Sequence, residues 1–315
     1  LVIDSTIKGK CAGAIRMTSE VTLHEVAALA KNMTLKYGFL GIPMGGAKMG
    51  IHIREPLSKL KRKSIFIDIG KSLSPLILGN CYYPGTDIGT TDQDINILLN
   101  AATPETRRWE SMPIAKYTSW TMIVSALEAL NELCFKLDAS TVAIQGFGRI
   151  GGSAAEIFSA NGAKIVAVST KKGAIYNSEG LDIAKLLELQ KKFGGEFVNQ
   201  TSIVATKISK DELLYLPVDI LLPCAGSWVI NSKNCHKIQS KIICPGANIP
   251  ITNEADEHLY NKGVLVLPDF VSNSGGALGA SIRSFATEQQ IRQIVEKEFR
   301  KRIFEVINLA KEEVS

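Results

Sequence analysis

The stretch that decides the fold is residues 142–151, which read VAIQGFGRIG, and a second apolar segment, KIVAV, follows at residues 164–168. This is the order strand, GxGxxG turn, helix, strand. In a dinucleotide-binding fold the first glycine makes the turn, the second admits the pyrophosphate, and the third lets helix and strand pack. A GxGxxG alone is weak, but the flanking strands predict a dinucleotide site. Its residues would be Gly146, Phe147, Gly148, Arg149, Ile150 and Gly151.

Three later apolar segments, at residues 220–223, 242–244 and 264–267, each run into a loop of small residues. The loops read CAGS, PGAN and SNSGG. Strands that alternate with helices predict a doubly wound parallel sheet, and the carboxyl ends of such strands face one ligand crevice. Ala225 and Gly226 in the first loop are therefore further candidates for cofactor contacts.

The end of the second strand bears on the choice of cofactor. An acid there would hydrogen-bond the adenosine ribose of NAD. The sequence has no carboxylate at this point, but two hydroxyls and two lysines that could receive a 2′-phosphate: Ser169, Thr170, Lys171 and Lys172. NADP is the favoured cofactor and NAD the alternative. The turn could also be an exposed basic turn without any role in selectivity.

A second distinctive stretch, MTLKYGFLGIPMGGAKMGI at residues 33–51, carries Lys36 and Lys48. Glycines beside Lys48 let the backbone approach a small ligand closely. A lysine on such a tight apolar element is poorly hydrated, so its proton is easier to remove. Asp87 lies among aromatic residues and glycines in the segment CYYPGTDIGT. Taken singly, each is better read as an ordinary charge: Lys36 as a solvated helix charge, Lys48 as a loop charge and Asp87 as a turn or capping aspartate.

The remaining pattern predicts two domains with a cleft between them. A capping box at Thr22 opens a helix, a second helix covers residues 56–73, and a long apolar helix at residues 119–137 could join the domains. We expect a substrate domain at residues 1–121 and a Rossmann domain at 122–284. The C-terminal helix, within residues 285–315, would pack back on the first domain.

Composition excludes several classes of function. The 315 residues are 45% hydrophobic and 21% charged, with a net charge of +5, which is typical of a soluble globular protein. The densest basic run, KLKRK at 59–63, reads as a solvated helix face, so we expect no nucleic-acid partner. The six cysteines form no CxxC pair, and no apolar run reaches membrane-spanning length. We therefore expect no metal, no membrane and a cytoplasmic location; the first residue is Leu1, so N-terminal sequence could be missing.

The motifs together resemble the glutamate/leucine/phenylalanine/valine dehydrogenase family of amino-acid dehydrogenases, along nearly the whole chain. The stretch at 33–51 is similar to the family's lysine-bearing core, and TDIGTTDQDI to the segment with its catalytic aspartate. TVAIQGFGRIGG through AVSTKKGAIYNSEGLD resembles the dinucleotide-binding half, and GAN and SNSGG its nicotinamide-side loops. The resemblance implies a homo-oligomeric enzyme that interconverts an amino acid with a 2-oxo acid and ammonia.

The resemblance also assigns roles to single residues. Lys48 would be the catalytic lysine and Asp87 its acidic partner, while Lys36 would bind the substrate carboxylate. Asn248 and Asn273 would lie near the nicotinamide ribose and the substrate, and Thr118 near the nicotinamide amide.

Two departures from the family pattern bear on function. Glutamate-specific members have a lysine where this chain has Ala12 and a serine where it has Ala280, so a pocket of Ala12, Ala277 and Ala280 predicts an apolar, bulky aliphatic or aromatic substrate. Glutamate is the alternative substrate. The family's T-G-x-G turn is replaced at 118–121 by TSWT, within an altered segment that begins at Asn100. There Trp120 would occupy space that the cofactor uses, which favours the further alternative of a nucleotide-binding relative without turnover.

Overall fold

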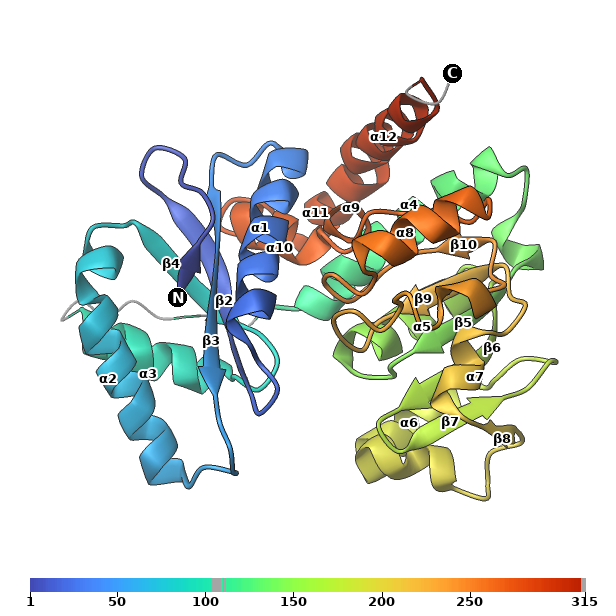
Figure 1. Cartoon of the computed structure of the whole chain (residues 1–315), viewed down its shortest axis with the longest axis horizontal. Helices are drawn as coiled ribbons and strands as arrows, with labels where there is room; N and C mark the ends of the chain where they lie inside the picture. The colour runs from blue at the N-terminus through green and yellow to red at the C-terminus, as the bar shows by residue number, and fades with distance from the viewer. Residues whose placement is uncertain (104–108, 110–111, 313–315) are drawn as a thin grey trace. The chain divides into compact units, whose positions relative to one another are not determined.

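The computed structural model describes residues 1–103, 109 and 112–312. Contacts divide the chain into an N-terminal unit, Leu1–Met112, and a C-terminal unit, Pro113–Ser315, and both are α/β (Figure 1). The sequence pattern had put the boundary after residue 121. The division falls earlier because helix α4, Ile114–Glu132, is continuous and belongs to one unit.

The N-terminal unit contains a four-stranded sheet in the order β1-β3-β2-β4. Strands β2, β3 and β4 are parallel, and β1 is antiparallel to β3. The sheet is accompanied by three helices, and α2 and α3 pack against each other. The bounds are β1 Val2–Ile3, β2 Cys11–Thr18, β3 Gly45–His52, β4 Tyr82–Thr86, α1 Leu23–Leu40, α2 Lys59–Leu78 and α3 Asp92–Ala102.

Helix α1 begins where the sequence predicts, because the Thr22 hydroxyl accepts a hydrogen bond from the Glu25 amide at 3.1 Å. It ends at Gly41, whose φ of 66° few other residues would adopt. A side chain at Gly46 of β3 would come within 2.2 Å of the Thr34 amide nitrogen, so only glycine lets α1 lie this close to the strand. On the other side of the sheet, Ile15, Phe66 and Leu98 belong to an apolar core that α2 and α3 complete.

The C-terminal unit is built on a seven-stranded sheet in the order β11-β10-β9-β5-β6-β7-β8. The first five strands in that order are parallel, and β7 and β8 extend the sheet antiparallel. The bounds are β5 Thr141–Gln145, β6 Lys164–Thr170, β7 Gly173–Tyr176, β8 Thr206–Ile208, β9 Ile220–Pro223, β10 Ile242–Ile243 and β11 Leu265–Val266. The predicted parallel sheet is confirmed; β7 and β8 were not predicted.

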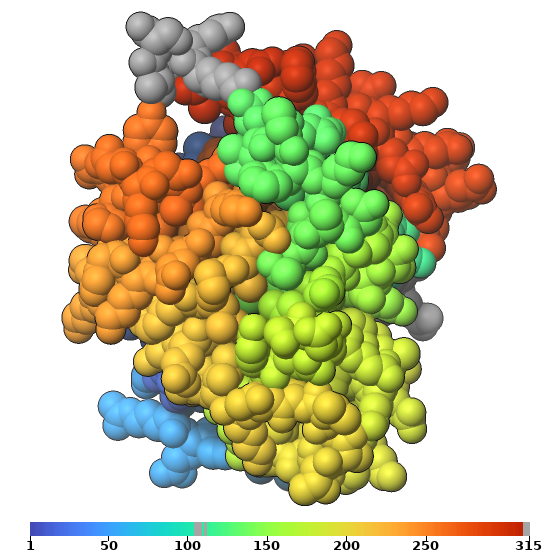
Figure 2. All heavy atoms as spheres, turned by 90° about the vertical axis from the view of Figure 1, so that its right-hand side faces the viewer, coloured from blue at the N-terminus to red at the C-terminus, as the bar shows by residue number. Residues whose placement is uncertain are grey.

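Helices cover this sheet, and further helices follow its last strand at the C-terminal end of the chain. Their bounds are α5 Arg149–Ala160, α6 Ile183–Phe193, α7 Lys210–Leu214, α8 Asn253–Asn261, α9 Asp269–Ser272, α10 Gly275–Ile282, α11 Glu288–Ile294 and α12 Arg300–Glu312. Helix α12 packs on α4 within the C-terminal unit, and Figure 2 shows the red C-terminal helices beside green α4. No helix in the described part of the chain has the length and apolar content needed to cross a membrane.

The strand order places a topological switch point at β5. The chain continues from β5 to β6 on one side and reaches β9 on the other side. Ligands of open parallel sheets bind at the carboxyl ends of strands beside such a point. The glycine turn after β5 and the CAGS loop after β9 meet there, since a Cβ at Gly146 would lie 2.8 Å from that of Ala225.

Candidate functional site

The parallel register of the N-terminal sheet brings the charged residues to one face. Arg16 on β2 pairs with Gly50 on β3, and Asp87 directly follows β4, where Ile15 pairs with Thr86. Because side chains alternate along a strand, Lys48 and Gly50 share the face that α1 covers. Arg16 and Asp87 share that face too. The small Ala14 side chain between β3 and β4 leaves room for Lys48 to reach across β2.

The four charged side chains form a connected cluster. Lys48 Nζ lies 2.6 Å from Asp87 Oδ2, and Arg16 Nε donates to the same oxygen at 3.0 Å. The Arg16 guanidinium also donates through Nη1 to Glu25 Oε1 at 2.6 Å. The Lys48 side chain is 4% exposed and that of Asp87 14%. Two cations therefore meet at one nearly buried carboxylate oxygen.

Burial and neighbouring charges set the protonation of this cluster. Burial lowers the pKa of Lys48; the attraction of Asp87 opposes this shift and repulsion from Arg16 adds to it, leaving the pKa below its ordinary value. Burial alone would raise the pKa of Asp87, but Lys48 and Arg16 outweigh it and hold that pKa well below the usual range. The pair thus joins a firmly ionised carboxylate to a lysine that releases its proton more readily than usual.

The loop that carries Asp87 is fixed from several sides. The Asp87 amide donates to Thr90 Oγ1 at 2.9 Å, and the Thr90 hydroxyl donates to the Ile15 carbonyl at 2.8 Å. Gly89 has a φ of 83°, and a Cβ there would lie 1.8 Å from the Met17 carbonyl oxygen, so the turn requires glycine. Arg62 donates to the Gly89 carbonyl at 2.7 Å and makes a two-point contact with Asp94 at 2.7 and 2.6 Å. One residue of the basic run is therefore directed inward, although the run was predicted to be solvated.

Lys36 and Ala12 lie in the same unit as this cluster. Lys36 is 5% exposed on α1, the helix that packs on β3. Ala12 pairs with Gly46 across the β2–β3 ladder and is partly exposed. The predicted roles of both residues in substrate binding stay predictions. Arg16 was not predicted; the signal in the sequence was an arginine in a strand whose neighbours, Ile15 and Met17, are apolar.

The glycine turn of the C-terminal unit has the shape that a dinucleotide needs. Gly146 has a φ of 96°, and a Cβ at Gly151 would lie 1.9 Å from the Gly146 carbonyl oxygen. A Cβ at Gly148 would meet nothing within 4 Å, and α5 begins there without a side-chain cap. Open space before uncapped helix amides suits a pyrophosphate. Gly226 on the neighbouring loop likewise borders open space.

Three of the four predicted adenosine-side residues are already engaged in contacts. Ser169 Oγ accepts from the Gly146 amide at 3.0 Å, and Thr170 Oγ1 donates to the Gly195 carbonyl at 2.8 Å. Lys172 forms an ion pair of 2.8 Å with Glu196, in which the two side chains are 56% and 51% exposed. Lys171 is exposed at the turn between β6 and β7. Glu196, which the sequence reading missed, brings a carboxylate to this turn.

The GAN and SNSGG loops meet, as their predicted roles require. Asn273 Nδ2 donates to the Ala247 carbonyl at 2.8 Å and to Asn248 Oδ1 at 3.2 Å. Asn273 is 4% exposed, and its buried Oδ1 has no hydrogen-bond partner. A buried unpaired acceptor is costly, so it fits a site that a bound group completes. Together with the glycine turn, it indicates that the residues fit a nicotinamide dinucleotide.

The altered turn at 118–121 is part of α4. Trp120 is 8% exposed, and its ring packs 5.5 Å from that of Tyr117, with the charges of Lys116 and Arg292 nearby. The Trp120 ring therefore packs against side chains of the C-terminal unit, and its predicted effect on the cofactor stays a prediction. Thr118 is buried against α10, where a Cβ at Gly276 would lie 3.3 Å from its hydroxyl. Residues 104–108 and 110–111 of the altered segment lie outside the described residues.

The predicted substrate-pocket alanines of α10 differ in exposure. Ala277 is partly exposed, and Ala280 is exposed. Their roles remain predictions. Among the described residues no group of three or more His, Cys, Asp or Glu side chains could hold a metal ion.

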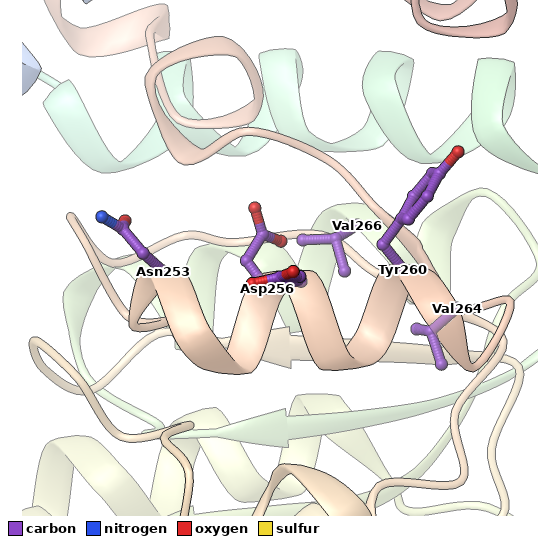
Figure 3. Close-up of a pocket in the computed structure, with 6 residues that line it drawn as sticks. Asn253, Asp256, Tyr260, Val264 and Val266 are labelled. Carbon is purple, nitrogen blue, oxygen red and sulfur yellow. The ribbon is translucent and has the colours of Figure 1, made fainter. Parts of the chain in front are cut away.

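Figure 3 shows a hollow on the surface beside α8 and the edge strand β11. It is lined by Asn253, Asp256, Glu257, Tyr260, Val264 and Val266. Burial and the nearby charge of Asp269 raise the pKa of Asp256. The lining includes none of the predicted site residues, and its carboxylates would repel a phosphate.

A doubly wound sheet with a glycine turn at its switch point defines a dinucleotide-binding α/β protein. Residues 2–103 match the family described as Glu/Leu/Phe/Val dehydrogenase, dimerisation domain, and residues 114–315 match Glutamate/Leucine/Phenylalanine/Valine dehydrogenase. The chain belongs to this family, as its motifs predicted.

Two relatives with similar sequences are glutamate dehydrogenases. One is the glutamate dehydrogenase of Aeropyrum pernix, 34% identical over 289 residues that cover 87% of this chain and 68% of the relative. The other is the NADP-specific glutamate dehydrogenase of Saccharolobus shibatae, 32% identical over 299 residues that cover 87% and 67%.

Solved structures share the fold. The hetero-hexameric glutamate dehydrogenase of Thermus thermophilus in its Leu-bound form superposes with a TM-score of 0.79 at 23% identity, covering 96% of this chain and 75% of that one. The glutamate dehydrogenase of Plasmodium falciparum gives 0.81 at 20% identity, covering 94% and 69%. At these identities the likeness is one of fold.

Proposed function

We propose that the chain is an NAD(P)-dependent amino-acid dehydrogenase, which interconverts an L-amino acid with its 2-oxo acid and ammonia. The observation that carries this proposal is the buried Lys48–Asp87 pair, at 2.6 Å, in a member of this family. A nicotinamide bound at the glycine turn would accept or supply the hydride. Lys48 would take the proton of the water that attacks the substrate carbon, and Asp87 would hold the proton exchanged with the leaving ammonia.

Lys36 completes this assignment of roles. A buried lysine of α1 would hold the substrate carboxylate by its charge, whereas the second lysine, Lys48, exchanges protons. Asn248 and Asn273 would contact the nicotinamide side, and Asn273 Oδ1 offers the unpaired acceptor. For the cofactor, the name of the Saccharolobus relative supports NADP, while Glu196 beside Lys172 supports NAD. Assembly into oligomers is supported by the hexameric Thermus enzyme.

Glutamate is the first candidate substrate, because the relatives with similar sequences are glutamate dehydrogenases. The comparisons do not support the apolar preference inferred from the sequence. One local observation nevertheless keeps an apolar substrate as the second candidate. Ala12 offers no charge, and a Cβ at Gly85 on the same face would lie 3.1 Å from the Trp109 ring and 3.8 Å from the Ala14 methyl. A carboxylate beside such a surface would be desolvated, and the cations on this face, Lys48 and Arg16, are already paired with Asp87.

A substrate panel tests both levels of the proposal. The protein is mixed with ammonium, NADH or NADPH, and 2-oxoglutarate, 4-methyl-2-oxopentanoate or phenylpyruvate, and absorbance at the nicotinamide band is followed. Lys48→Ala serves as the inactive control. Turnover of any of the three acids supports a dehydrogenase, and the highest kcat/KM identifies the substrate class. Cofactor binding without turnover across a broad panel of 2-oxo acids would instead support the non-catalytic relative.

The Ala12→Lys variant separates the two substrate classes further. If the side chain of the substrate lies beside Ala12, the added ammonium should raise kcat/KM for 2-oxoglutarate relative to 4-methyl-2-oxopentanoate by about tenfold or more. Ala12→Ser, which adds a polar group at the same position without a charge, is the matched control. An unchanged ratio in Ala12→Lys would mean that the side chain of the substrate lies elsewhere.

A further inference from the structure

We propose that Arg16 is a positioning residue, which fixes Asp87 against Lys48 and supplies the positive charge that favours release of the Lys48 proton. This inference rests on the proposed dehydrogenase function. It gives a role to a residue to which neither the sequence motifs nor the similar proteins give one.

The geometry ties Arg16 to both the catalytic carboxylate and the helix above it. Its Nε donates to Asp87 Oδ2 at 3.0 Å, and its Nη1 donates to Glu25 Oε1 at 2.6 Å. The guanidinium is planar, so contacts through two of its nitrogens fix its orientation. Arg16 itself is only 5% exposed. Its side chain, from β2, holds Asp87 Oδ2 on one side, and Lys48 approaches the same oxygen from β3.

The two cations at this oxygen differ in what they can do. An arginine keeps its charge at every working pH, whereas a buried lysine readily becomes neutral. Repulsion within the cluster can therefore be relieved only at Lys48. The charged groups that act on Lys48 come from three elements: Arg16 on β2, Asp87 after β4 and Glu25 on α1. Lys36, also on α1, is unchanged in every variant below.

The opposing charges predict opposite effects for two substitutions. Arg16→Met removes a like charge and should raise the pKa of Lys48, because the repulsion is lost. Glu25→Gln removes an attractive charge and should lower that pKa. Since oxidative deamination needs neutral Lys48, the acid limb of the kcat/KM profile should move to higher pH in Arg16→Met, by about one pH unit, and to lower pH in Glu25→Gln.

A purely structural arginine would behave differently. Arg62→Met is the comparison variant, because Arg62 also anchors the loop of Asp87, through the Gly89 carbonyl and Asp94, but is not among the charges that shift the pKa of Lys48. Its acid limb should stay where it is in the unsubstituted protein even if its stability falls. Arg16→Lys keeps the charge and should keep the limb close to that position, with a lower kcat because a lysine cannot bridge Asp87 and Glu25. If Arg16→Met does not fold, Arg16→Lys and Glu25→Gln carry the test.

A second readout separates this inference from the proposed function. Trace acetylation with acetic anhydride, followed by mass spectrometry of the Lys48 peptide, reports the neutral fraction of Lys48 against pH without any turnover. A labelling curve shifted in opposite directions by the two substitutions supports the role of Arg16, even if every substrate in the panel fails. Turnover in the unsubstituted protein with both the pH limb and the labelling curve unmoved in Arg16→Met would overturn the inference and leave the proposed function intact.

Discussion

The two units place their charges in different surroundings. In the N-terminal unit, the side chains of Lys48 and Asp87 are 4% and 14% exposed, and Lys48 and Arg16 both contact the same carboxylate oxygen of Asp87. In the C-terminal unit, Lys172 and Glu196 form a pair of similar length that is 56% and 51% exposed. Water screens the second pair and hardly screens the first. At similar distances we therefore expect different roles: the buried charges would adjust proton transfer, and the exposed charges would adjust the recognition of a ligand.

The largest effect is expected at Asp87. Asp87→Asn keeps the shape of the side chain but removes the charge that balances Lys48 and Arg16, so turnover should fall by about a thousandfold or more. Binding of NADPH, measured by fluorescence, should change little. A variant that retains a tenth of the activity would show that Asp87 is not part of the catalytic pair.

The next effect concerns stability. Arg62→Met should destabilise the protein by about 3 kcal/mol at pH 7, because it leaves the nearly buried Asp94 without its cationic partner, although the hydrogen bonds from Thr91 remain. The folded-state pKa of Asp94 is lowered below its unfolded value, so this stabilisation is present above about pH 4 and is lost as the pH falls through the folded pKa. Urea unfolding at several pH values measures the free energy of unfolding of the unsubstituted protein and of Arg62→Met. The difference between the two values should become smaller in acid. A constant difference across that range would contradict the assignment.

The sequence predicted the parts of the molecule that local pattern determines. The VAIQGFGRIG stretch folds as strand, turn and helix because each residue type suits its own position. Lys48 and Asp87 could be paired only through the family resemblance, since 39 residues separate them along the chain. Arg16 was missed because its contact with Asp87 depends on the β2–β4 ladder, which no local pattern specifies. The short polar strand β8 reads like a loop until β7 pairs with it.

A smaller effect is expected at Lys36, which lies in the N-terminal unit like Lys48 and Asp87. If this buried lysine binds the substrate carboxylate, Lys36→Ala should raise the KM for the amino acid by about tenfold to a hundredfold, with a smaller loss in kcat. Lys31→Ala, on an exposed position of the same helix, is the control. Initial rates over a range of substrate concentrations separate the two constants. A loss confined to kcat would place Lys36 in proton transfer instead.

The smallest effect is expected at the exposed pair. Glu196→Gln removes a carboxylate from the β6–β7 turn and leaves Lys172 free to meet a 2′-phosphate, so the preference for NADPH over NADH should rise by about twofold to fivefold. Lys171→Ala should lower that preference by a similar factor if the turn recognises the phosphate. Dissociation constants for both cofactors at low and high salt give the ratio, and an unchanged ratio in both variants would mean an exposed turn without a role in selectivity.

We expect the buried pair of the N-terminal unit to perform the proton chemistry while the C-terminal unit binds the cofactor. Turnover and NADPH affinity, measured side by side in the unsubstituted protein and in Lys48→Ala with the best substrate of the panel, separate these two roles. In Lys48→Ala turnover should fall by about a thousandfold or more, while the dissociation constant of NADPH should stay within about twofold. Turnover within tenfold of the unsubstituted protein, or loss of NADPH binding in a folded variant, would contradict this expectation.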